Sequence, residues 1–287
     1  MIYLALSIIA STWIFILFKL FNTYGINTQH AIVINYLSAC LFGLWIYEEP
    51  IVIHNIISSA WIYGAIVLGF LFIAIFNVMA LTAQRHGLSV ASVASKMSVI
   101  IPVIFGIYVY HEGAGFQKII GIILALVSVY LSSAKPKTSK KLASGLWLPI
   151  LLFIGSGVID TSIKYIETNY LPDNGIPIFS ATIFGFAFLI GTCILIFNAF
   201  KTPFKLPFKT ILGGAVLGIV NYGSMYYLLK ALNHESLESS TLFTINNVAI
   251  VMICTLLGLL LFKEKIYKMN WAGIVLAIVS IVIVTLA

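Results

Sequence analysis

Two ionisable side chains lie deep inside long apolar stretches of the sequence, Lys96 and Asp160. A charge near the centre of a membrane costs roughly 3 kcal/mol on insertion scales, so each needs a partner or a function. Counted along the spans given below, Lys96 lies about 12 Å and Asp160 about 21 Å from the same membrane face. That separation suits a zwitterion such as an amino acid, with its anionic group at Lys96 and a cationic group, or a proton, at Asp160. The structural alternatives are an Asp160–Lys164 pair within one helix and a snorkelling or structurally paired Lys96.

Neutral polar and aromatic residues within the apolar stretches form a second group. We expect them to line a cavity, although asparagine often joins helices and tyrosine often lies at the membrane interface. The candidates are Trp13, Asn77, Asn221, Tyr222, Tyr226, Asn246 and Asn247. Lys19 and Lys164 fall near opposite membrane faces, where they are expected at the mouth of the cavity or against lipid headgroups.

Motifs for catalysis and cofactor binding are missing from the sequence. His111 and Glu112 lack the second histidine of a zinc-protease motif, and there is no GxSxG, phosphate-loop or dinucleotide pattern. The cysteines Cys40, Cys193 and Cys254 lie in apolar runs without a CxxC pair, which argues against disulfides and metal sites. We therefore expect no enzyme activity, no metal and no cofactor.

The composition indicates which solvent surrounds these residues. Of the 287 residues, 61% are hydrophobic and only 9% are charged, whereas a soluble domain carries about 25% charged residues. The net charge of +7 comes from lysines in short connectors, where contact with lipid headgroups explains it better than nucleic acid does. An all-α integral membrane protein is expected, with a retained first helix and no cleaved signal peptide. Its predicted transmembrane helices cover residues 2–21, 30–47, 60–82, 88–110, 117–133, 146–166, 176–198, 211–230, 237–262 and 269–286.

These ten spans divide into two sets of five. The basic segment 134–145, AKPKTSKKLASG, separates a first repeat at 1–133 from a second repeat at 146–287. Residues recur at constant spacing between the halves: Gly106, Glu112 and Gly121 as Gly258, Glu264 and Gly273, and Ser11, Lys19 and Thr23 as Ser156, Lys164 and Thr168. Because five is odd, the second copy must enter the membrane from the opposite face. Inverted repeats of this kind are typical of secondary transporters, which bind their substrate near the midplane.

The sequence also resembles a known family. Trp13 and Lys19 in the first span, and LSVASVASKMSVIIPVIFGIYVYHEG at 88–113 with Pro102 and Glu112, are similar to the ten-helix EamA-like group of the drug/metabolite transporter superfamily. The second copy keeps Gly258 and Glu264 but has Cys254 in place of the proline, so a symmetric kink is not expected. The resemblance implies transport of small organic solutes, often by export of amino acids or other metabolites.

We therefore expect a multi-pass transporter in the plasma membrane, the inner membrane in a bacterium, acting as a monomer or homodimer with a possible coupling proton. Most lysines and arginines fall on one face, which the positive-inside rule makes cytoplasmic, with both termini outside. The family resemblance implies the opposite orientation. The functional alternatives are a flippase for a lipid-linked carrier and a non-transporting receptor or scaffold.

Overall fold

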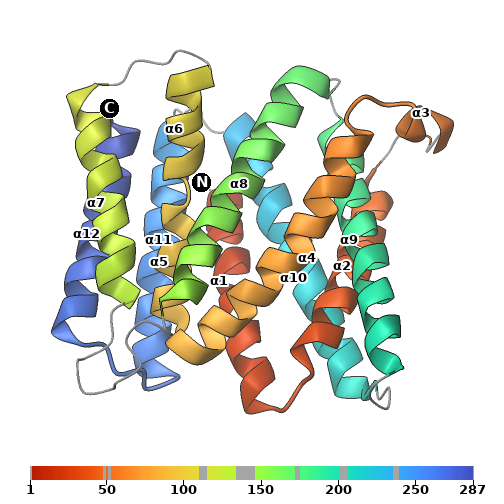
Figure 1. Ribbon diagram of the computed structural model, residues 1–287, viewed down its shortest axis with the longest axis horizontal. Helices are drawn as coiled ribbons and strands as arrows, with labels where there is room; N and C mark the ends of the chain where they lie inside the picture. The colour runs from red at the N-terminus through yellow and green to blue at the C-terminus, as the bar shows by residue number, and fades with distance from the viewer. Residues whose placement is uncertain are drawn as a thin grey trace. The chain divides into compact units, whose positions relative to one another are not determined.

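The computed structural model describes residues 2–47, 50, 53–109, 115–133, 146–171, 175–200, 206–234 and 239–286. In these ranges the chain forms helices and no strand (Figure 1). The helices are α1 (Ile2–Thr23), α2 (Thr28–Ile46), α3 (Ile53–Ile57), α4 (Ile62–His86), α5 (Leu88–Met97), α6 (Ile100–Val109), α7 (Phe116–Ser133), α8 (Trp147–Tyr170), α9 (Ile176–Ala199), α10 (Phe208–His234), α11 (Ser239–Leu260) and α12 (Lys268–Thr285).

Each of the ten predicted spans corresponds to a helix or, in one case, to two. The fourth span is divided into α5 and α6, and the short α3 was not predicted. Within the described residues, seven helical segments are long and apolar enough to cross a membrane, and α7, α11 and α12 contain shorter apolar stretches. The all-α integral membrane class is thereby confirmed, while the inverted arrangement of the repeats stays a prediction.

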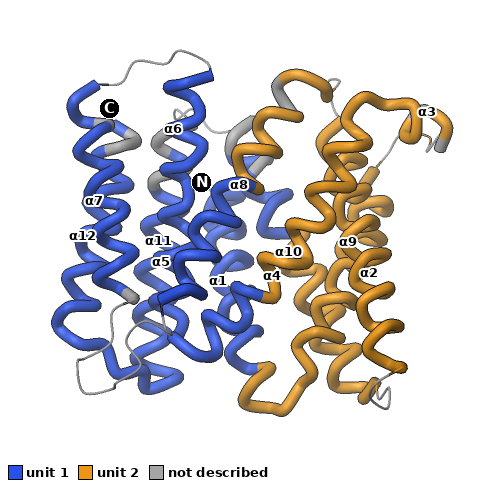
Figure 2. Tube along the Cα trace, in the orientation of Figure 1, with its two compact units in different colours: residues 1–20, 78–158, 223–287 blue, residues 21–77, 159–222 orange. Residues whose placement is uncertain are grey.

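The helices form two compact units (Figure 2). Unit 1 comprises residues 1–20, 78–158 and 223–287, and unit 2 comprises residues 21–77 and 159–222. Each unit takes helices from both halves of the sequence, and α1, α4, α8 and α10 contribute residues to both units. The compact units therefore cut across the predicted repeats at 1–133 and 146–287, which remain a prediction.

In unit 1, helices from the two halves of the sequence pack together: α7 lies along α12, and α5 along α11. Gly273 of α12 meets the backbone of Ser132 of α7 so closely that a Cβ at Gly273 would overlap the Ser132 nitrogen. The Asn270 amide also donates to the carbonyls of Leu131 and Ser132, at 3.1 and 2.9 Å. A small residue and partly buried hydrogen bonds thus hold this pair together, as is usual for helices in lipid.

In unit 2, α2 packs along α9 and is also crossed by α10. The Tyr36 ring of α2 stacks on Phe184 of α9 at 6.0 Å, and its hydroxyl donates to the Phe72 carbonyl at 2.8 Å. On the other side, a Cβ at Gly214 of α10 would lie 2.6 Å from the Ala31 carbonyl oxygen of α2. Glycines therefore bring α10 into backbone contact with α2.

Candidate functional site

The fourth span is interrupted at residues 98–99, shortly before Pro102. Pro102 has no N–H to donate to the carbonyl of Ser98, and the Ile101 N–H donates to that carbonyl instead, at 2.9 Å. This tighter turn separates α5, which ends at Met97, from α6, which begins at Ile100. In α11, which corresponds to the fourth span in the predicted repeat, the helix continues through Cys254. The asymmetry expected from the missing second proline is therefore present.

Lys96 lies in the last turn of α5, directly before this break, and its side chain is half-buried. The negative end of a helix dipole favours a cation in the last turn. Buried hydroxyls surround this part of unit 1: Ser92 is fully buried, and the Cys254 thiol lies beside the hydroxyls of Ser92 and Thr12 and within electrostatic range of Lys96. A cation at the end of a helix, next to a break in a span, is suited to binding an anionic group.

Asn246 and Asn247 of α11 are 1% and 7% exposed. The Ser7 hydroxyl of α1 lies 3.3 Å from the Asn246 amide oxygen and 3.0 Å from the carbonyl oxygen of Ser224 in α10. These contacts connect three helices of unit 1 through polar atoms. Asn246 therefore takes part in a buried polar cluster that joins helices, and its predicted contact with solute stays a prediction.

Three predicted residues of unit 2 make contacts within the protein. The Asn221 amide donates to the Asn35 side-chain oxygen at 3.3 Å, and the Tyr222 ring meets Phe42 edge-on at 5.6 Å. The Asn77 amide donates to the Ile73 carbonyl of its own helix at 2.7 Å. The Asn221 contact is of the kind expected for the structural alternative, in which asparagine joins helices. The cavity-lining role of these three residues stays a prediction.

The remaining predicted residues are more accessible. Trp13 is 47% exposed on α1, and Asp160 and Lys164 are exposed on α8. The Tyr226 ring of α10 lies under the Lys230 ammonium, with 4.8 Å from the nitrogen to the ring centroid. Lys96 belongs to unit 1 and Asp160 to unit 2, so their predicted cooperation on one solute stays a prediction.

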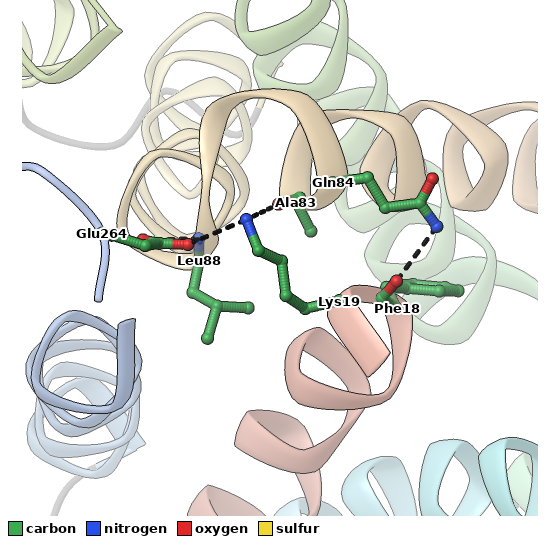
Figure 3. Close-up of polar contacts among 6 residues, drawn as sticks. All are labelled: Phe18, Lys19, Ala83, Gln84, Leu88 and Glu264. Atoms are coloured by element: carbon green, nitrogen blue, oxygen red, sulfur yellow. Dashed lines mark hydrogen bonds and ion pairs between the residues drawn. The ribbon is translucent and has the colours of Figure 1, made fainter. Parts of the chain in front are cut away.

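Lys19 belongs to a polar cluster at one end of unit 1 (Figure 3). Its ammonium lies 3.2 Å from Glu264 Oε1 and donates to the Ala83 carbonyl at 3.3 Å. The Leu88 N–H, at the start of α5, donates to both Glu264 oxygens, at 2.9 and 3.1 Å. Glu264 thereby provides the negative charge that a helix N-terminus favours, although it comes from the segment between α11 and α12.

Two glycines make room for this carboxylate. Gly87 has a φ of +100°, a backbone conformation that residues with a side chain rarely adopt. A Cβ at Gly87 would lie 2.5 Å from Glu264 Oε2. A Cβ at Gly258 would lie 2.6 Å from the same oxygen. We call Lys19, Gly87, Leu88, Ser89 and Gly258 the Glu264 cradle.

The sequence pointed to Glu264 only as a mark of the repeat. The available signal was that Glu112 recurs as Glu264 and Lys19 as Lys164. Charged residues that recur at constant spacing within apolar segments indicate that their positions matter. Nothing in the sequence indicated that Lys19, Leu88 and Glu264 would meet. Glu112 lies outside the described residues.

Among the described residues, no group of His, Cys, Asp and Glu side chains could hold a metal ion.

In comparison with known proteins, residues 144–286 match the EamA-like transporter family. The chain is also 25% identical over 284 residues to an uncharacterized protein of Haemophilus influenzae, covering 97% of this chain and 95% of that protein.

Proposed function

Because the chain belongs to the EamA-like transporter family, whose members are transporters rather than enzymes, we propose that it exports a small polar or amphipathic metabolite, such as an amino acid, across the plasma membrane. The solute binds in a central cavity between two inverted repeats and is carried without a nucleotide or metal cofactor. Lys96 meets the anionic group of the solute, and Asp160 meets its cationic group or a coupling proton.

The observation that carries this proposal is the position of Lys96. It is half-buried in the last turn of α5, next to the break at Ser98 and within electrostatic range of the buried Cys254 thiol. Interrupted helices provide binding groups in many secondary transporters, because the turn exposes backbone groups and helix ends to the solute. The negative end of the α5 dipole stabilises this charge, and the break beside it leaves the ammonium next to backbone groups that are not part of a continuous helix.

Transport assays test the assignment. Proteoliposomes loaded with a mixture of labelled amino acids are compared for wild type, Lys96→Gln and Asp160→Asn, with Lys265→Gln as the control because Lys265 is an exposed connector lysine. We expect Lys96→Gln to lower kcat/KM for anionic and zwitterionic solutes at least tenfold, which corresponds to about 1.4 kcal/mol, and the control to be unchanged. Equal flux for Lys96→Gln and Lys265→Gln would remove Lys96 from the site.

A pH gradient separates the two roles of Asp160. If Asp160 carries a coupling proton, an imposed gradient changes wild-type flux and has no effect on Asp160→Asn. A gradient that leaves wild-type flux unchanged excludes the proton role. Movement of a lipid-linked solute, with no flux of free amino acids, would favour the flippase alternative.

A further inference from the structure

The Glu264 cradle has the groups of an anion-binding site. Its donors are the Lys19 ammonium, at 3.2 Å from the carboxylate, and the first N–H of α5, at 2.9 and 3.1 Å. A helix N-terminus with a nearby cation is a common arrangement for holding carboxylates and phosphates. In this structure the protein's own Glu264 carboxylate lies among these donors (Figure 3).

A second observation points to a ligand at this position. The Ser89 hydroxyl, in the first turn of α5, is 4% exposed and has no hydrogen-bond partner among the described residues. A Cβ at Gly258 would lie 3.4 Å from the Ser89 Oγ and 2.6 Å from Glu264 Oε2, so both oxygens border the same space. The Glu264 carboxylate therefore leaves one buried donor of the cradle unused. A structural cap shaped only for Glu264 has no need for this extra donor.

We propose that the Glu264 cradle is a carboxylate-binding site, which Glu264 fills in this conformation and which the carboxylate of a solute takes when Glu264 leaves. The cradle lies at Leu88, the first residue of α5, and Lys96 lies eight residues further along the same helix. The Lys19 ammonium in the cradle and the Lys96 ammonium therefore mark two positions about 12 Å apart along α5. An anionic solute would bind first at one and then at the other. This role in transport rests on the proposed function, whereas anion binding by the cradle does not.

Chemical rescue tests the cradle directly. Glu264→Ala removes the Cγ methylene and the carboxylate, which together are the size of acetate. The variant is purified in detergent, and its Tm is measured in sodium acetate, in sodium chloride of equal ionic strength, and with acetamide as the neutral molecule of the same shape. We expect acetate alone to raise the Tm, saturably, by about 3 °C at five times its Kd. Wild type, in which Glu264 fills the site, should respond equally to both salts.

Two further variants assign the effect to the cradle. Lys19→Met combined with Glu264→Ala should abolish the acetate response, and Ser89→Ala combined with Glu264→Ala should raise the acetate concentration for half the effect several-fold. If acetate and chloride act equally on Glu264→Ala, or if the Lys19→Met combination keeps the response, the site is refuted. Should Glu264→Ala fail to yield folded protein in either salt, Glu264→Gln is measured in its place. Its neutral amide is displaceable by acetate, and equal Tm values in the two salts would refute the site.

The outcomes for the cradle and for transport are separable. A lost acetate response together with Lys96-dependent flux refutes the cradle and leaves the proposed function in place. An acetate response together with unchanged flux in Lys96→Gln supports the cradle and refutes the role of Lys96 in the proposed function. If both hold, Lys19→Met should raise KM for carboxylate-bearing solutes more than for their methyl esters, and an equal change in both would refute the role of the cradle in transport.

Discussion

The contact between α10 and α2 gives a prediction whose size follows from the structure. Gly218 of α10 faces the backbone of α2, and a Cβ there would overlap the Asn35 carbonyl oxygen and lie 2.7 Å from Ser38 Cβ and 3.1 Å from Ala39 N. Most of these atoms belong to the backbone or are fixed to it, so a side-chain rotation cannot relieve the overlap. Relative to a normal contact of about 3.5 Å, Gly218→Ala requires the helices to separate by about 1 Å.

That separation has two costs. Overpacking a closely fitted contact costs about 1–3 kcal/mol. The Asn221–Asn35 hydrogen bond, already 3.3 Å long at the same contact, would exceed the hydrogen-bonding range of about 3.5 Å, and its loss costs about 0.6–1.5 kcal/mol. We therefore expect Gly218→Ala to lower the free energy of unfolding by about 2–4 kcal/mol, and the Tm by about 5–15 °C.

The control is Gly223→Ala on the same helix. A Cβ at Gly223 would lie 3.6 Å from the Tyr227 ring, which is ordinary contact, and alanine favours the helix by up to about 1 kcal/mol over glycine. Both variants are heated in detergent, and the fraction that remains monodisperse is measured by size-exclusion chromatography. A Tm for Gly218→Ala equal to or above that of Gly223→Ala would refute the close α2–α10 contact.

Three further predictions concern other parts of the chain. Lys263 has a left-handed φ of 51°, a conformation that costs a non-glycine residue about 1 kcal/mol or more. Lys263→Gly should therefore raise the Tm and Lys263→Val should lower it. The opposite order of Tm values would contradict this backbone conformation. Asn270→Leu removes the hydrogen bonds to Leu131 and Ser132 and should lower the Tm by several degrees, more than Ser280→Ala, which removes one bond to Gly121. A periplasm-active reporter fused to Ala287 should be active if the charge bias sets the orientation, whereas a reporter active only in the cytoplasm would support the orientation implied by the family.

The helices were predictable because the physics that places them is local. A run of about 20 apolar residues is sufficient for a membrane span, and Pro102 marked the span that the structure divides into α5 and α6. The small α3 was missed because Ile53–Ile57 is too short to give a periodic pattern.

The side-chain partners were less predictable because lipid-facing and protein-facing residues are equally apolar. Nothing in the sequence of α10 indicates which side faces α2, so the bond between the Asn221 amide and Asn35 could not be predicted. Depth along a span likewise left the environment of Lys96 undetermined. Lys19 was predicted near a membrane face, but its contact with Glu264 depends on how α1, α5 and the segment after α11 come together.

The pairing of α2 with α9 and of α7 with α12 has a consequence for how the chain is made. During synthesis α2 and α7 enter the membrane before α9 and α12 have been made. Until then, the surfaces of α2 and α7 that contact these helices face lipid. Glycine-lined contacts such as that of Gly273 with Ser132 can form only after the last helix has been inserted. The contacts of α2 and α7 with their partners can therefore form only after α9 and α12 have been inserted.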